Sequence, residues 1–349
     1  MEETKELDFY VKIARRPLKD LSHLKNEQTQ KEYMGSWEKV FNNSNDITIW
    51  SWREIWKKNI ASNLKEFEYF HRDHSIKIFA NELLDRPCIL VGAGSSLENN
   101  IHHLKTAKEM GITILVASHA FMYLNDIGVK PDYVVQLDAG GQWDAYLEGD
   151  SKDIPLLCDI TCDTRQLKSW QGPKYFFSST VNQQTNAGKF YMMERDRIVT
   201  GNKVGSIIET GGHVGGAMLV LARSIMQANK IIFTGYDYCF SPNKKFYPFD
   251  KDIDKHWTTE NGEKRQTPPI IDGHIPDIFG NMCETDGSYL GFKNIIDNSV
   301  RVLRAEQLAK GSDVEFINAC EGGALGVVEG GLSKWMQYLK LDDALIAAK

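Results

Sequence analysis

The sequence lacks several features that would assign it at once to a class of protein. It has no surplus of positive charge, since 41 Lys and Arg residues stand against 47 Asp and Glu residues and the formal net charge is -6. A nucleic-acid-binding domain usually carries a basic surface, so the composition argues against nucleic acid as a partner. Internal repeats and low-complexity tracts, which would indicate a repeat architecture or a disordered tail, are also missing.

Long apolar runs are absent as well. The longest helical apolar stretch, residues 215–226, is interrupted by Arg223 and is too short to cross a bilayer. The N-terminal sequence MEETKELDFY is acidic and does not have the basic and then apolar form of a signal peptide. We therefore expect a cytoplasmic protein without a membrane span.

Cysteine is scarce, and its spacing does not indicate a metal site. The six cysteines include no CxxC pair, and Cys158 and Cys162 lack the neighbouring histidines of a zinc site. Cys88, Cys239 and Cys320 stand in or beside apolar runs, where a thiol usually packs as a small hydrophobe. This usage is typical of a reducing compartment. Separately, we expect neither a bound metal nor a tightly bound cofactor.

What the sequence does contain is a change of pattern near residue 86. Residues 1–85 are polar, with apolar residues at helical spacing over 52–67, which predicts a helical N-terminal segment. Residues 86–330 alternate short apolar strands with helices. This predicts an α/β domain with a Rossmann-like, mainly parallel sheet and helices on both faces. A C-terminal helix is expected over 331–349, beginning at about Leu332.

One region interrupts this alternation. Residues 241–285 are rich in Pro, Asp, Lys and Gly, and a connection of this length is usually a lid, a binding loop or a disordered segment. It carries His256 and His274.

The stretch CILVGAGSSLENN, residues 88–100, predicts a strand, a glycine-rich turn and a helix that starts at Ser95 or Ser96. Ser95 and Glu98 have the spacing of a capping box. The N–H groups at such a helix start attract an anion such as phosphate, although the same pattern also fits a tight turn without a ligand.

The commonest functional motifs with such a glycine-rich turn are not supported by the sequence. The turn has no Walker A lysine, and Leu97 stands where a dinucleotide fingerprint has its third glycine. The second strand ends in Ser118 and His119 instead of the acidic residue that binds a ribose. A hydrolase G-x-S-x-G motif is also absent from this turn.

Other predicted strands also end in polar residues beside glycines. Asp138 follows the third strand, where it could bind a ribose, an acceptor or a metal, or form an Asx turn. Ligands of parallel sheets bind at the carboxyl ends of strands, so we expect these residues to gather in one cleft. The residues expected to bind the ligand are Gly92, Gly94, Ser95, Ser96, Ser118, His119, Thr210, Gly211, Gly212, His213, Asp237, Tyr238, Asn318 and Glu321.

The segments VGAGSSLENNIHHL, GVKPDYVVQLD, GGHVGGAMLVLA, IIFTGYDY and INACEGGAL occur in this order. Their order resembles the Maf-type flagellin glycosyltransferases and the wider 6-hydroxymethylpterin diphosphokinase MptE-like domain family, over about residues 59–330. Ser95 stands where the family motif has proline. The resemblance implies a Rossmann-like fold, a distant similarity to bacterial sialyltransferases and a CMP-activated sugar as donor.

The resemblance implies a transferase that moves a nonulosonic, sialic-like acid from CMP to a hydroxyl of a protein or glycan. Asp138, His256 or His274 would accept the hydroxyl proton. The N-termini of the helices that begin at Ser95 and at His213 would stabilise the leaving phosphate without a strong need for metal. The 241–285 loop would close as a lid that excludes water.

Two alternatives remain open. A 6-hydroxymethylpterin diphosphokinase would use ATP and Mg²⁺, but Gln136 stands in place of the first acid of that branch's acidic pair. A non-catalytic nucleotide-binding module would use the same strand ends without chemistry.

Overall fold

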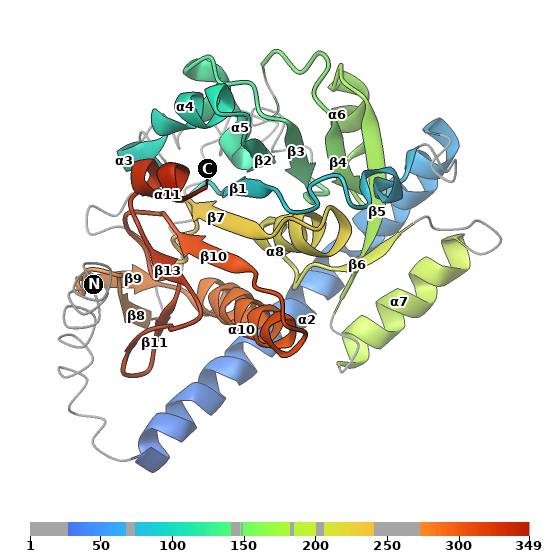
Figure 1. The fold of residues 1–349 in the computed structure, drawn as a ribbon. Coiled ribbons are helices and arrows are strands. Elements are labelled where there is room, and N and C mark those ends of the chain that lie inside the picture. The colour runs from blue at the N-terminus through green and yellow to red at the C-terminus, as the bar shows by residue number, and fades with distance from the viewer. Residues whose placement is uncertain are drawn as a thin grey trace. The chain divides into compact units, whose positions relative to one another are not determined.

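The computed structural model describes residues 27–67, 74–140, 147, 149–181, 185–199, 206–240 and 273–348. The chain divides into two compact units, and Figure 1 labels their helices and strands. Unit 1 comprises Met1–Asn42, Gly92–Leu104 and Lys230–Lys349, and unit 2 comprises Asn43–Val91 and Lys105–Asn229. The chain passes from unit 2 into unit 1 at Gly92, directly after the first strand.

Unit 2 contains a parallel sheet whose strands neighbour one another in sequence order. The strands are β1 (Pro87–Val91), β2 (Thr113–Ala117), β3 (Tyr133–Gln136), β4 (Leu156–Asp159), β5 (Lys174–Thr180) and β6 (Ile207–Glu209). All residues of β2, β3 and β4 are buried. Parallel strands that are covered on both faces have this continuous apolar character.

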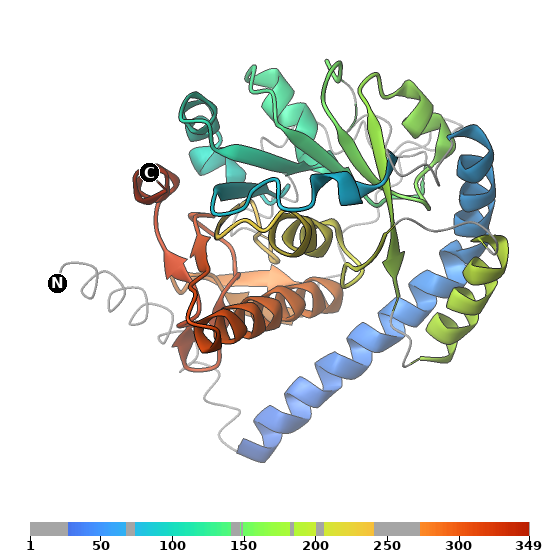
Figure 2. The ribbon, with the colours of Figure 1, turned by 45° about the vertical axis from the view of Figure 1, so that its right-hand side comes forward.

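Helices cover both faces of this sheet. Helix α5 (Ser118–Asp126) packs on β2 and β3, and α8 (Val214–Val220) packs on β1, β2 and β3 from the opposite side (Figure 2). The other helical segments are η3 (Ile76–Phe79), α4 (His103–Glu109), α6 (Thr164–Ser169), α7 (Asn186–Val199) and the π-helical turn η5 (Leu221–Ile225). This arrangement confirms the predicted Rossmann-like α/β fold.

Unit 1 contains a second group of parallel strands, β7 (Lys230–Thr234), β10 (Glu315–Asn318) and β13 (Gln337–Tyr338), with β10 in the centre. Two antiparallel pairs accompany them: β8 (Gly273–Pro276) with β9 (Met282–Thr285), and β11 (Val327–Val328) with β12 (Gly331–Leu332). The helices of this unit are α3 (Leu97–Asn100), α10 (Gly287–Ala309) and α11 (Leu341–Ala347).

Helix α2 (Glu27–Glu66) confirms the prediction of a helical N-terminal segment. Its buried Ile49 packs with Ala187, Tyr191 and Met192 of α7. Trp56 meets the ring of Tyr191 edge-on, with ring centroids 5.0 Å apart. The N-terminal helix is thus anchored in unit 2 by apolar packing.

Three predictions of local structure were wrong. The C-terminal helix begins at Leu341 instead of near Leu332, because residues 331–338 enter strands β12 and β13. The single helix expected after the glycine-rich turn is two short helices, α3 and α4. Residues 273–285, expected within a loop, form the hairpin β8–β9.

Within the residues that the structure describes, no helix is long and apolar enough to cross a membrane. All six cysteines are buried and free of disulfides, in agreement with the packing role predicted for Cys88, Cys239 and Cys320.

Candidate functional site

The glycine-rich turn holds an anion, but that anion is the chain's own Asp237, which follows β7 in unit 1. The backbone N–H of Ser96 donates to Oδ2 of Asp237 at 2.8 Å, and the Ser96 hydroxyl makes a short hydrogen bond to Oδ1. The Ser95 hydroxyl lies 3.4 Å from Oδ2. These contacts use the donors that were expected to bind a phosphate.

The N-cap of helix α3 is Ser96, whereas the predicted capping box had Ser95 in that position. Ser96 is the N-cap of α3 but makes no side-chain capping hydrogen bond, because its hydroxyl donates to Asp237. Helix α3 also has only four residues, so its dipole is small. The long-range contact with Asp237 outweighs the local capping preference.

Burial raises the pKa of Asp237 to about 6, while the hydrogen bonds from Ser96 and Ser95 act in the opposite direction. Asp277 adds a smaller upward contribution through its charge. A second bound anion at this place would add repulsion to a carboxylate that is already costly to ionise.

Glycine is required at positions 92 and 94 for close packing of the backbone, whether or not a ligand binds. A Cβ added at Gly92 would lie 2.3 Å from the carbonyl oxygen of Gly235, and one at Gly94 would lie 2.5 Å from Cγ of Asp237. The two backbone segments are also bonded, since Gly94 N–H donates to Gly235 O at 2.8 Å. Both glycines permit the turn after β1 and the turn after β7 to approach closely.

The other strand-end residues of unit 1 also have internal partners. Asn318 donates to the carbonyl of Leu325 at 2.8 Å and accepts from the N–H of Cys320 at 3.0 Å. Oε1 of Glu321 accepts from the N–H of Leu341 at the start of α11. The carbonyl of Tyr238 accepts from the Thr285 hydroxyl at 2.9 Å. Their predicted role in ligand binding stays a prediction.

Of the two histidines predicted in the 241–285 region, His274 lies within the described residues. His274 lies on β8 opposite Glu284 and is exposed. His256 lies outside the described residues, as does most of the predicted lid. The hairpin itself is fixed to the strand ends, because Phe240 N–H donates to Glu284 O at 2.7 Å and Ile278 N–H donates to Gly323 O at 2.9 Å.

In unit 2, the structure brings together two predicted site residues from neighbouring strand ends. His119 follows β2 and Asp138 follows β3, and Nε2 of His119 lies 3.1 Å from Oδ2 of Asp138. The Asp138 side chain is 41% exposed, whereas that of His119 is 19% exposed. The pair therefore presents a carboxylate to solvent with an imidazole behind it. Ser118, also predicted at this edge, is buried at the first position of α5.

The loop after β6, Thr210 to His213, leads into α8 at the same edge of the unit 2 sheet. Gly211 and Gly212 both have positive φ angles, 64° and 82°. Nδ1 of His213 accepts from the N–H of Gly216 at 3.1 Å and so caps α8. Desolvation lowers the pKa of His213 to about 3, so the imidazole is neutral at physiological pH.

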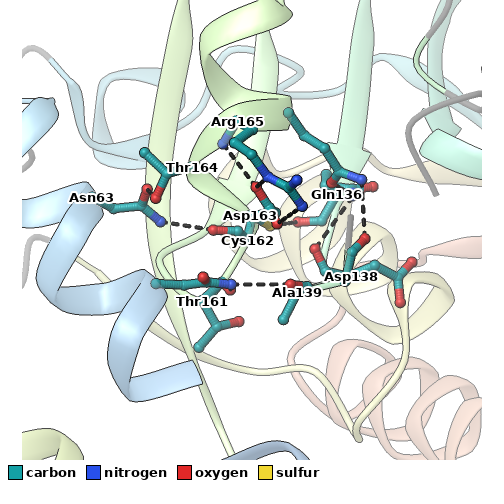
Figure 3. A network of polar contacts seen from close by, with 12 residues as sticks. Asn63, Gln136, Asp138, Ala139, Thr161, Cys162, Asp163, Thr164 and Arg165 are labelled. Atoms are coloured by element: carbon teal, nitrogen blue, oxygen red, sulfur yellow. Dashed lines mark hydrogen bonds and ion pairs between the residues drawn. The ribbon is translucent and has the colours of Figure 1, made fainter. Parts of the chain in front are cut away.

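Two residues before Asp138 the chain carries an amide, Gln136, instead of a second carboxylate. Gln136 is buried, and Figure 3 shows it beside Asp138, to whose carbonyl its Nε2 donates at 3.4 Å. The same Nε2 donates to Oε1 of Gln166 at 3.2 Å. In the part of the chain that the structure describes, no group of three or more His, Cys, Asp or Glu side chains could hold a metal ion. Sequence reasoning did not identify Gln166, or Asn59 and Asn63 of α2, as neighbours of this site.

The parallel sheet with polar residues after its strands defines an α/β protein of the Rossmann-like type. Residues 58–243, just over half of the chain, match the family described as 6-hydroxymethylpterin diphosphokinase MptE-like. The chain belongs to this family, which confirms the resemblance seen in the sequence.

One similar solved structure is that of a Maf glycosyltransferase from Magnetospirillum magneticum AMB-1. The TM-score is 0.50 and the sequence identity 13%, over 79% of this chain and 40% of that chain. At this identity the similarity shows a shared fold, and this chain spans about two fifths of the length of its neighbour. No curated protein matches the chain.

Proposed function

We propose that the protein is a glycosyltransferase that moves a nonulosonic, sialic-like acid from a CMP-activated donor to a hydroxyl group of a protein or glycan. The observation that carries the proposal is the pair of His119 and Asp138 at adjacent strand ends, with Nε2 and Oδ2 3.1 Å apart. The fold shared with a Maf glycosyltransferase supports the same class of reaction. We propose a cytoplasmic location because all six cysteines are free and buried.

Asp138 would act as the general base. The acceptor oxygen attacks the anomeric carbon of the sugar, its proton passes to the carboxylate, and the bond to the phosphate oxygen of CMP breaks with its electron pair. Nε2 of His119 lies 3.1 Å from one carboxylate oxygen, Oδ2, and so would restrict the positions that the Asp138 side chain can take. Asp138 suits the base role better than His119 because its side chain is the more exposed of the two.

The leaving phosphate of CMP would be stabilised at the loop after β6. The N–H of Gly212 already donates to Oγ1 of Thr210 at 3.2 Å, so the N–H of Gly211 in the same turn would be the donor to the phosphate. The neutral His213 would support this loop by capping α8, without contributing a positive charge. We propose that metal is not required, or enhances the reaction only weakly.

The second candidate function is ATP-dependent pyrophosphoryl transfer to a hydroxymethylpterin, which the description of the matching family favours. That reaction asks for carboxylates that hold Mg²⁺ between the phosphates. Gln136 is the last residue of β3, two residues before Asp138, and is hydrogen-bonded to Gln166, so an amide stands where a paired carboxylate would be needed. This arrangement supports glycosyl transfer over pyrophosphoryl transfer.

The functions can be separated with the purified full-length chain. We expect CMP to raise the melting temperature without Mg²⁺, and CMP-N-acetylneuraminic acid to release CMP. Stabilisation by ATP with Mg²⁺ alone would contradict the glycosyltransferase and favour the pyrophosphokinase. If CMP stabilises the chain but no CMP is released from the donor with any protein or glycan acceptor, the protein is a nucleotide-binding module without catalytic activity.

A further inference from the structure

We propose that Asn59 of the N-terminal helix α2 is a positioning residue for Asp138. Asn59 is buried, and its Nδ2 donates to the carbonyl of Ala139 at 3.0 Å, one residue after Asp138. The same Nδ2 donates to the carbonyl of Thr161 at 2.9 Å, after β4. One side chain therefore ties the loop that carries Asp138 to the neighbouring strand end.

The backbone around Asp138 is held at successive carbonyl groups. Gln136 Nε2 lies 3.4 Å from the carbonyl of Asp138, Asn59 Nδ2 lies 3.0 Å from that of Ala139, and Gln166 Nε2 lies 3.0 Å from that of Gly140. Each bond fixes the plane of one peptide group, and together they fix the backbone from which the Asp138 side chain projects. Of these contacts, those from Asn59 come from outside the sheet and its crossover helices.

Precise placement of a base has a large effect on rate, because a shift of about 1 Å can reduce turnover about 100-fold. Asn59 donates to backbone carbonyl groups, those of Ala139 and Thr161. Its action would be through the backbone, which would give α2 a direct role in the geometry of the site.

Asn63 provides a matched control on the same helix. It lies one turn after Asn59, is also buried, and its Nδ2 donates to the carbonyls of Ile160 and Cys162, both at 2.8 Å (Figure 3). Its Oδ1 also accepts from the Thr164 hydroxyl at 2.7 Å. Asn63 thus anchors α2 to the loop after β4 with the same chemistry, but does not contact the loop that carries Asp138.

The test compares Asn59→Ala with Asn63→Ala in the full-length chain, and it rests on the proposed function for its kinetic part. With CMP-N-acetylneuraminic acid as donor, we expect Asn59→Ala to lower kcat about 10- to 100-fold with less than about a threefold change in KM. Asn63→Ala is expected to keep kcat within about twofold of the wild type, while it lowers the melting temperature at least as much as Asn59→Ala does. Gln166→Leu, which removes the hydrogen bond to the carbonyl of Gly140, should lower kcat in the same way as Asn59→Ala.

Hydrogen exchange followed by mass spectrometry gives a readout that does not depend on activity. We expect Asn59→Ala to accelerate exchange in the peptide covering residues 133–140, and Asn63→Ala to accelerate it in residues 160–166 instead. Equal kcat in the two variants would overturn the positioning role while leaving the glycosyltransferase intact. A wild-type chain that releases no CMP would overturn the glycosyltransferase, and unchanged exchange in residues 133–140 would overturn the hold of Asn59 on this loop.

Discussion

The glycine-rich turn of unit 1 and the strand ends of unit 2 look alike in sequence but differ in how their polar groups are used. In the turn, Asp237 is buried and takes up the donors of Ser95 and Ser96. After β2 and β3, His119 and Asp138 form a pair that remains partly exposed. Polar residues beside glycines at a strand end therefore do not define a ligand site by themselves; their internal hydrogen bonds have to be counted first.

The largest effect on activity is expected at Asp138. We expect Asp138→Asn to lower the rate of CMP release from CMP-N-acetylneuraminic acid about 10²- to 10⁴-fold, because the amide cannot accept the acceptor's proton. The melting temperature should change little, since the side chain is partly exposed. Retention of full activity would remove Asp138 from the proposed mechanism.

Substitutions in the glycine-rich turn, by contrast, should lower the free energy of unfolding. Gly92→Ala would place a Cβ 2.3 Å from the backbone oxygen of Gly235, and we expect a loss of about 3 kcal/mol in the free energy of unfolding. Gly311→Ala is the control, because Gly311 has φ +74° with open space around it and should cost only about 1 kcal/mol. Denaturant titrations measure both, and equal losses would show that crowding at Gly92 is not the reason for the glycine.

Asp237 should make stability depend on pH. Its pKa is raised from 3.8 to about 6 on folding, so between these values the folded chain binds more protons than the unfolded chain. Stability therefore falls as pH rises through this window, by up to about 3 kcal/mol. In Asp237→Asn this contribution is absent, so the free energy of unfolding of the wild type minus that of the variant should decrease from pH 4 to pH 7. A constant difference would contradict the raised pKa.

The smallest effect is expected at His119. His119→Ala removes the imidazole that lies 3.1 Å from Asp138, but leaves the carboxylate itself. We expect turnover to fall about 10-fold through a less well positioned base. Alanine at the exposed His102 is the matched control and should have no effect on turnover. A larger loss at His119 than at Asp138 would exchange the proposed roles of the two residues.

The sequence allowed the fold to be predicted in outline because buried parallel strands are short apolar runs, as in residues 87–91 and 113–117. It could not reveal the bond between Ser96 and Asp237, because these residues are separated by 141 positions and either could have served a ligand. The start of α11 was misplaced for a similar reason, since the pairing of β13 with the distant β10 determines the structure of Gln337 and Tyr338.

For the candidate site, His119 and Asp138 could be found individually because they follow predicted strands, whereas their contact depends on the register of β2 and β3. Asn59 and Asn63 had a weak signal, two amides at i and i+4 on one helix face. Their partners are backbone carbonyls, which any sequence supplies, so the pairing could not be deduced before the structure.

The most direct test of the account is to locate CMP on the full-length chain by hydrogen exchange with and without the nucleotide. We predict slower exchange in unit 2, in peptides covering residues 118–124, 136–140 and 210–216, and no change in residues 92–100. Protection confined to residues 92–100, or no protection at saturating CMP, would contradict the assignment of the nucleotide-sugar site to the strand ends of unit 2.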